Sequence, residues 1–383
     1  MKNILITGGA GFIGSQIVTK LFETNEWNIT VLDNLSEQIH GNNPSHSYLY
    51  SLIKDKCHFI NGDIRNFDIV SQAVKDAECI IHLAAETGTG QSMYQINRYN
   101  EVNIMGTSNL FQAISNLGKS SKVKKIILSS SRSVYGEGKY NCSTCGVVFP
   151  KSRNRETMIK GDFNLYCPKC GKKLDLVSTT EDSLINPCSL YAFTKYSQEK
   201  MLQTLCPAMN IDYTIFRFQN VYGAGQSLKN PYTGILSIFS TLMLENKPVN
   251  IFEDGLESRD FVHVKDIADG VIASIDNSQS NSEIINIGSG LNTTVIRIAE
   301  ILKKSYNSQS KLNITGDFRI GDIAHNKADI SKAQKLLGFV PKISLEEGLF
   351  DFCKWVKNQS TDNSGYEKSL NEMEQSGLFF RKK

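Results

Sequence analysis

Tyr191 and Lys195 stand four residues apart in the segment Tyr-Ala-Phe-Thr-Lys. On a helix, residues with this spacing share a face, so the lysine ammonium can lie close to the phenol. A nearby positive charge lowers the pKa of a tyrosine and makes the phenolate available as a base near neutral pH. Taken alone, the pair indicates oxidation or reduction at a carbinol carbon.

Two Cys-x-x-Cys pairs precede Tyr191, and each is followed by a glycine that permits a tight turn. Their members are Cys142, Cys145, Cys167 and Cys170. Four thiolates at this spacing can bind one zinc ion, and they leave no open position for a catalytic water. We therefore expect a structural zinc ribbon at 141–175. The other cysteines are scattered, which is typical of a reducing compartment, so we expect a cytoplasmic protein.

The elements that must position these residues begin at the N-terminus. A short apolar run there is typical of a buried parallel strand, and apolar residues at helical spacing follow it. Between them lie Gly8, Gly11 and Gly14, in the strand–turn–helix context that binds a dinucleotide pyrophosphate. The next predicted strand, 29–32, ends in Asp33, whose carboxylate would bind an adenine ribose and repel a 2′-phosphate. This pattern predicts NAD and not NADP.

The alternation of predicted strands and helices continues along the chain. Further strands are expected at 58–60, 79–85, 125–130 and 213–218. Alternating elements with buried-type strands predict an α/β fold with a doubly wound parallel sheet of the Rossmann type. His82 lies inside an apolar run, so we expect a packed core histidine and not a catalyst.

Composition limits the classes of function. The chain has 383 residues, of which 40% are apolar and 21% charged, so we expect a globular protein of two or three structural units. Its net charge of +3 is too small to indicate binding to nucleic acid or to a membrane surface. No apolar run is long enough to predict a transmembrane helix, and the N-terminal one is too short for a signal peptide.

Several motifs, in sequence order, resemble the extended short-chain dehydrogenase/reductases of the NAD-dependent nucleotide-sugar epimerase/dehydratase family. They are Gly8-x-x-Gly11-x-x-Gly14, Asp63-Ile64, His82-Leu83-Ala84-Ala85, Asn103-Ile104-Met105-Gly106-Thr107, Ser131 before Val134-Tyr135-Gly136, Tyr191-x-x-x-Lys195, Arg217-Phe218-Gln219-Asn220-Val221-Tyr222-Gly223 and Arg259-Asp260-Phe261-Val262-His263-Val264. The resemblance covers 1–355 apart from the cysteine insert. It implies an enzyme that binds NAD and a nucleotide-diphosphate sugar.

The resemblance also implies a role for each matched position. Tyr191 would be the base, Lys195 would hold the nicotinamide ribose, and Ser131 would bond the reacting sugar hydroxyl. The rest of the implied cofactor site is Gly8, Gly11, Phe12, Ile13, Gly14, Asp33, Asn34, Asp63, Ile64, Leu83, Ala84, Ala85, Asn103 and Ser129. The implied substrate contacts are Glu86, Thr87, Ser131, Asn220, Arg259, Arg319 and Asp322. An arginine fork suits a diphosphate.

The family hosts epimerases, dehydratases, decarboxylases and ketoreductases, so the fold does not settle the reaction. The dehydratases carry an acidic pair after the residue equivalent to Ser131 and the decarboxylases a glutamate, whereas this chain has Arg132 and Ser133. We therefore expect 4-epimerisation, in which C4 is oxidised, the 4-keto sugar turns about its diphosphate, and hydride returns to the other face. The alternatives are an NAD(P)H-dependent 4-ketoreductase of a dTDP-4-keto-6-deoxyhexose, a UDP-hexose 4-epimerase and a non-catalytic NAD-sensing regulator.

Two loops resemble those of dTDP-L-rhamnose 4-epimerases, which form dTDP-6-deoxy-L-talose and carry a similar cysteine insert. One loop is 86–92, and the other, 218–234, contains Gly225-Gln226-Ser227 and Asn230-Pro231-Tyr232-Thr233-Gly234. One departure is Ala324, where the family often has arginine. This resemblance implies dTDP-L-rhamnose as the substrate and a place in cell-surface polysaccharide biosynthesis.

The expected organisation has four parts. They are a dinucleotide-binding domain of 1–140 and 176–228 with a return segment near 259–275, the insert at 141–175, a substrate domain of 229–258 and 276–356, and a polar tail at 357–383. Because the tail is low in apolar residues, we expect a partly disordered surface appendage.

The family implies a homodimer formed through the helices of Asn103 and Tyr191. We expect the basic insert to stabilise a loop beside the site. Alternatively, it covers the sugar pocket or contacts a partner.

Overall fold

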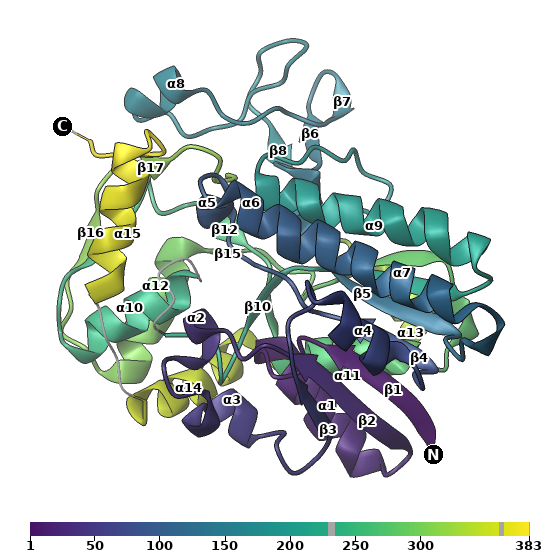
Figure 1. Ribbon diagram of the computed structural model, residues 1–383. Helices are drawn as coiled ribbons and strands as arrows, with labels where there is room; N and C mark the ends of the chain where they lie inside the picture. Colours follow the sequence, from purple (N-terminus) through teal and green to yellow (C-terminus); the bar gives the residue numbers. More distant parts are fainter. Residues whose placement is uncertain (229–233, 360–363, 383) are drawn as a thin grey trace.

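The computed structural model describes residues 1–228, 234–359 and 364–382. Seven parallel strands form one sheet in the order β14-β9-β5-β4-β1-β2-β3 (Figure 1). They are β1 (Lys2–Thr7), β2 (Trp27–Asp33), β3 (His58–Asn61), β4 (Cys79–His82), β5 (Lys125–Ser131), β9 (Asp212–Phe218) and β14 (Glu283–Ile287). The strand order reverses between β1 and β4, so the expected doubly wound parallel sheet is confirmed.

Alternate residues of each buried strand enter two separate cores, one on each face of the sheet. In β1, Ile4 and Ile6 join one core and Leu5 joins the other. The helices of the first face are α1 (Phe12–Thr24), α11 (Val264–Ser274) and α13 (Ser331–Leu337), and those of the second are α4 (Phe67–Val74), α7 (Gly106–Leu117) and α9 (Leu190–Ala208). Because both faces are covered, the central strands are mostly apolar in their middle residues.

Short helical segments connect these elements. They are α2 (Glu37–His40), η1 (Pro44–His46), α3 (Tyr48–Ser51), α5 (Thr89–Ser92), α6 (Ile96–Tyr99), the π-helical η2 (Asn100–Met105), η3 (Gly118–Ser120), η4 (Arg132–Tyr135) and η5 (Ser278–Ser280). Among the residues that the structure describes, no helix is both long enough and apolar enough to cross a bilayer.

The strand that returns to the large sheet differs from the expected one. Within the expected return segment, 259–275, β13 (Phe261–His263) pairs with β10 (Asn220–Tyr222) outside that sheet. The returning strand is β14, which was expected in the substrate domain. Its fourth residue, Asn286, looks unsuited to a buried strand. In the structure its amide is satisfied by the Tyr135 hydroxyl at 2.8 Å and by a main-chain carbonyl at 3.0 Å.

A smaller C-terminal unit has its own apolar core, which includes Phe239, Leu302 and Phe352. Its elements are α10 (Ile235–Leu244), α12 (Val295–Tyr306), α14 (Leu345–Lys357) and the strand pairs β11 (Val249–Ile251) with β16 (Leu312–Ile314) and β12 (Ser258–Arg259) with β15 (Thr293–Thr294). The remaining domain boundaries stay predictions.

The cysteine insert forms a separate layer, seen at the top of Figure 1. It contains a three-stranded antiparallel sheet in the order β7-β6-β8. Its elements are β6 (Tyr140–Cys142), β7 (Gly146–Val148), α8 (Arg155–Ile159) and β8 (Asp175–Leu176).

The C-terminal tail was expected to be a partly disordered surface appendage, and its described residues contain regular secondary structure. The tail forms α15 (Ser364–Gln375) and β18 (Phe379–Phe380), and β18 pairs antiparallel with β17 (Phe318–Arg319). Leu370, Met373 and Phe379 are buried together. Although the tail has few apolar residues, helical spacing and the following strand bring these three to one face, where they pack on an existing surface.

Candidate active site

A cleft of about 370 Å³ lies at the carboxyl ends of the central strands. Dinucleotides bind doubly wound sheets at this edge, where the strand order reverses. Every predicted cofactor residue except Asn103 lines the cleft, as do Glu86, Thr87 and Ser131. A larger depression of about 570 Å³ near Lys119 lies away from Tyr191 and the glycine turn.

The glycine turn is shaped by close main-chain approach. Gly8 has a φ of +72°, and a Cβ there would lie 2.7 Å from Ala84 N. A Cβ at Gly14 would lie 2.4 Å from Gly8 O, whereas at Gly11 the nearest atom would be 3.2 Å away. Helix α1 begins directly after Gly11, and the N–H groups of its first turn have no acceptor within the helix. The turn therefore fits a pyrophosphate group.

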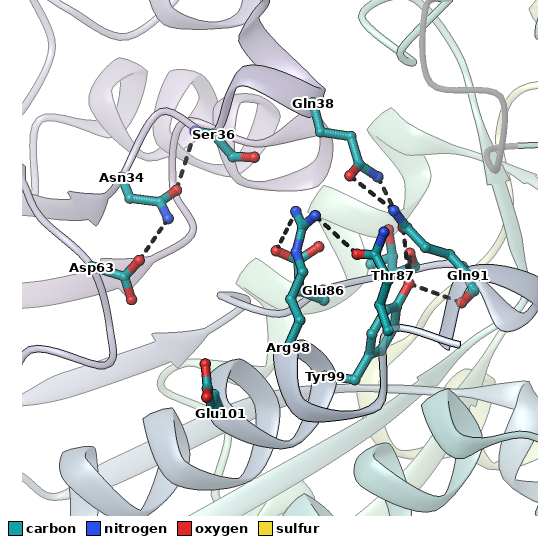
Figure 2. A network of polar contacts seen from close by, with 12 residues as sticks. Asn34, Ser36, Gln38, Asp63, Glu86, Thr87, Gln91, Arg98, Tyr99 and Glu101 are labelled. Atoms are coloured by element: carbon teal, nitrogen blue, oxygen red, sulfur yellow. Dashed lines mark hydrogen bonds and ion pairs between the residues drawn. The ribbon is translucent and has the colours of Figure 1, made fainter. Parts of the chain in front are cut away.

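The adenosine end of the cleft carries two predicted carboxylates. Asp33 accepts from Ala10 N at 3.0 Å and Leu35 N at 2.9 Å; burial raises the pKa of Asp33, and these N–H bonds oppose the rise. Figure 2 shows the Asn34 side chain donating to Asp63 at 3.0 Å. Hydrogen bonds from Arg65 lower the pKa of Asp63 to about 2, although partial burial opposes them. Both carboxylates are thus held in place before any ligand binds.

Asn103 lies behind the cleft, on the π-helical segment and not on a regular helix. Its side chain accepts from Glu86 N at 2.8 Å and donates to Glu86 O at 3.1 Å. It also donates to Thr194 Oγ1 at 2.9 Å, on the helix of Tyr191. Asn103 therefore joins the 86–92 loop to the catalytic helix.

A polar network holds the 86–92 loop at the rim of the cleft (Figure 2). Arg98 pairs with Glu86 at 2.8 Å, and the Tyr99 hydroxyl contacts the carbonyls of the loop. The amides of Gln38 and Gln91 bond each other reciprocally at 3.1 and 3.2 Å. Gln38 lines the cleft on the adenosine side, so this pair joins the two sides of the rim. Sequence reasoning missed the pair because Gln38 belongs to no motif and nothing in the sequence links it to Gln91 of the 86–92 loop.

Tyr191, Ser131 and Lys195 come together at the inner end of the cleft. Burial raises the pKa of Tyr191, while a hydrogen bond with Ser131 and the charge of Arg132 lower it. The Lys195 ammonium extends to β5 and donates to Ser129 O at 2.8 Å, and its expected effect on the pKa of Tyr191 stays a prediction. Burial lowers the pKa of Lys195 to about 7.

His82 is a core residue, as expected. Its ring nitrogens contact the hydroxyls of Thr7 at 2.7 Å and Thr107 at 2.9 Å, and burial lowers its pKa to about 3.

Four predicted substrate contacts do not line the cleft: Asn220, Arg259, Arg319 and Asp322. Arg259 donates to Ala324 O at 3.1 Å, and Arg319 lies 3.4 Å from the Asp322 carboxylate. Residues 230–233, which carry part of the predicted substrate loop, lie outside the described residues.

The four insert cysteines meet in space. Their sulfur atoms all lie within 4.8 Å of one another, and Cys142 Sγ is 3.5 Å from Cys170 Sγ. Gly146 and Gly171 have φ values of +72° and +73°, so the tight turn expected after each pair is present. This donor set fits one tetrahedral metal ion, whose identity stays a prediction.

Comparisons with known proteins agree with this geometry. Residues 4–153 and 167–288 match the NAD dependent epimerase/dehydratase family. The chain is 36% identical to the dTDP-L-rhamnose 4-epimerase of Burkholderia thailandensis over 94% of this chain and 96% of the relative. It is 32% identical to the UDP-glucuronate 4-epimerase of Thermodesulfobacterium geofontis, over 93% and 97%.

Solved structures give the same result. The UDP-glucose 4-epimerase of Thermotoga maritima with UDP-glucose superposes with a TM-score of 0.74 at 29% identity, over 93% of this chain and 98% of that one. The UDP-glucuronic acid 4-epimerase of Bacillus cereus, in complex with UDP-glucuronic acid and NAD, gives 0.74 at 28%, over 93% and 99%. The chain therefore belongs to the NAD dependent epimerase/dehydratase family and is an NAD-dependent nucleotide-sugar epimerase, an isomerase.

Proposed function

We propose that this enzyme is a 4-epimerase that converts dTDP-L-rhamnose to dTDP-6-deoxy-L-talose. The observation that carries the reaction type is the convergence of Tyr191, Ser131 and Lys195 on one cleft. Arg132 and Ser133 follow Ser131, where an eliminating enzyme would need carboxylates. The 36% identical Burkholderia relative supports the choice of sugar.

The residues at the inner end of the cleft can carry out a reversible oxidation at C4. Bound NAD supplies a reversible hydride acceptor. Tyr191 takes the proton from the C4 hydroxyl and returns it after the sugar has turned, and Ser131 bonds the C4 oxygen throughout. In this proposal Lys195, whose ammonium also donates to Ser129 O, bonds a ribose hydroxyl of the cofactor and stabilises the phenolate. Asn103 hydrogen-bonds both the Tyr191 helix and the 86–92 loop and so fixes their relative positions.

The test is to incubate the purified enzyme with dTDP-L-rhamnose and no added cofactor, and to follow inversion at C4 by NMR. We expect an equilibrium mixture with the talose epimer, because the cofactor is regenerated in each cycle. UDP-glucose and UDP-glucuronic acid serve as competing substrates, since relatives are named for them. The proposal is wrong if dTDP-L-rhamnose stays unchanged while a UDP-sugar is epimerised. Stoichiometric consumption of NAD(P)H would indicate the ketoreductase.

We further infer that the insert cysteines bind one zinc ion as a structural site, because the four sulfurs converge and leave no open position. Metal analysis of the purified protein should give about one zinc per chain. Cys142→Ser should lower this content, while Cys57→Ser, a cysteine far from the insert in sequence, should not. Equal zinc in the two variants would contradict the site.

We also infer a homodimer through the helices of Asn103 and Tyr191. Three large apolar side chains on these neighbouring elements are exposed in the single chain: Ile96 at 52%, Met105 at 56% and Phe193 at 51%. Apolar side chains gathered in this way are typical of an interface. Size-exclusion chromatography with light scattering should give a dimer, and Phe193→Asp should shift it towards a monomer. A monomeric wild-type protein would overturn this inference.

A further inference from the structure

Arg153 belongs to the insert, yet other parts of the molecule enclose its side chain, which is only 2% exposed. Its guanidinium forms a two-pronged ion pair with Glu253, in which Nη2 donates to Oε1 at 2.8 Å. Glu253 follows β11 in the smaller unit and is 3% exposed. Glu137, which follows the Ser131 segment, lies 3.8 Å from Nε of Arg153. One residue of the insert is therefore buried between carboxylates from two distant parts of the chain.

The same guanidinium reaches a segment that carries predicted substrate contacts. Arg153 Nη2 also donates to the main-chain oxygen of Asp322 at 2.9 Å. Two residues later, Ala324 N donates to Glu137 at 2.9 Å, and Ala324 O accepts from Arg259 at 3.1 Å. Charged side chains thus hold the main chain of this segment at consecutive points, and Arg153 is the one that the insert supplies.

Aromatic side chains hold the preceding strand. Phe163 of the insert and Phe380 of the tail both pack against Phe318 of β17, with ring centroids 6.4 and 5.2 Å apart. Figure 1 shows α8 of the insert beside β17 and the C-terminal end of the chain. We call residues 318–324, together with the side chains that hold them, the substrate wall.

We propose that Arg153 is a positioning residue, which holds the substrate wall beside the cofactor cleft so that Arg319 and Asp322 can bind the diphosphate and nucleoside of the substrate. The proposal rests on the proposed function, which supplies a nucleotide-diphosphate sugar as the ligand, and on the family resemblance, which implies these roles for Arg319 and Asp322. A planar guanidinium can satisfy a carboxylate and a peptide oxygen at once, which a lysine ammonium cannot do in the same geometry. A buried ion pair adds little stability relative to apolar side chains of similar volume, so stability alone does not account for it.

The test removes Arg153 together with Glu253, its two-pronged partner, because an unpaired buried charge could unfold the protein. Glu137 stays in this variant and keeps its hydrogen bond from Ala324 N. The variant is Arg153→Met with Glu253→Leu, and Lys151→Met, an exposed charge of the same insert, is the matched control. Calorimetry gives Kd for dTDP and UDP, and kinetics give KM and kcat for the sugar that is turned over. We expect Kd and KM to rise roughly 10- to 100-fold, kcat to stay within about threefold and bound NAD to remain. Arg153→Lys should recover part of the affinity.

Hydrogen–deuterium exchange of peptides that span 317–325 gives a readout that needs no substrate. Exchange there should become faster in the double variant, while peptides of β1 and α1 keep their protection. The proposal is overturned if Kd and KM of the double variant stay at wild-type values. This holds both when deuterium exchange is unchanged and when it becomes faster throughout the protein. Failure of the proposed function is distinct: wild type then leaves dTDP-L-rhamnose unchanged, yet Kd for dTDP or UDP and local exchange still report on Arg153.

Discussion

The cofactor cleft and the substrate wall are built in different ways. The cleft is shaped by main chain, because the glycine turn leaves no room for a Cβ at Gly8 or Gly14. The wall is assembled from side chains, with Arg153, Glu137 and Glu253 coming from three separate parts of the sequence. A binding site fixed by main-chain geometry tolerates few amino-acid substitutions, so it stays specific for one ligand. A region held by side chains can change with the substrate while the cofactor stays the same.

The largest expected effect separates chemistry from binding. Tyr191→Phe removes the proposed base, so kcat should fall by about 10²- to 10⁴-fold. Bound NAD and Kd for dTDP should change little, because the phenol shapes neither the glycine turn nor the wall. Single-turnover kinetics and the NAD content of the purified protein test this. A kcat within tenfold of wild type would place the base elsewhere.

Two glycines of one turn test whether main chain controls the cleft. A Cβ at Gly14 would meet Gly8 O at 2.4 Å and Gly9 Cα at 2.6 Å, so Gly14→Ala should lower the free energy of unfolding by about 3 kcal/mol or more. Gly11→Ala has more room and should keep its melting temperature while it lowers the affinity for NAD. Denaturant unfolding and NAD titration measure the two effects. If Gly14→Ala and Gly11→Ala lost equal stability, the space for a Cβ would not explain the difference between the two positions.

The buried lysine of the cleft predicts a pH dependence that the wall does not share. Burial lowers the pKa of Lys195 to about 7 from an ordinary value near 10.5, so between these pH values the unfolded chain binds more protons than the folded one. The stability of NAD-free protein should therefore rise with pH in this range, by at most about 1.4 kcal/mol per pH unit. Urea unfolding at pH 7, 8 and 9 should show this rise in wild type and a smaller one in Lys195→Met. Identical slopes would contradict it.

The smallest expected effect concerns side chains at the rim of the cleft. Gln38→Ala removes the reciprocal amide pair with Gln91, which should weaken NAD binding by about 1 kcal/mol, a few-fold change in Kd. A double-mutant cycle with Gln91→Ala isolates the coupling between the two amides, and Gln112→Ala on α7 is the control. If the coupling energy between the two amides is zero, this side-chain pair does not help to retain the cofactor. The cleft would then depend on main chain alone, in contrast to the side chains that hold the substrate wall.

Sequence reasoning succeeds where a pattern is local. The glycine turn, the Tyr191–Lys195 spacing and the paired cysteines each involve residues that are neighbours in the chain, and the structure brings each set together. Strand β14 was missed because its signal is weak: a buried asparagine interrupts it, and only the folded surroundings satisfy that amide.

The substrate wall could not be predicted from the sequence. Arg153 and Glu253 are 100 residues apart, and no periodicity or motif links them. In the sequence, Arg153 is one of several basic residues of the insert, whose ordinary interpretation is a solvated charge. The tail gave a similarly weak signal, because its apolar residues are few and become significant only against the surface they cover.

The pairing of β18 with β17 means that part of the substrate wall can form only after β18 has been synthesised. Phe379 and Phe380 are synthesised long after the glycine turn, because most of the sequence lies between them. A nascent chain can therefore complete most of its nucleotide-binding sheet while the strand of Arg319 still lacks its partner. A premature stop codon just before β18 would leave that strand unpaired and spare all seven strands of the sheet.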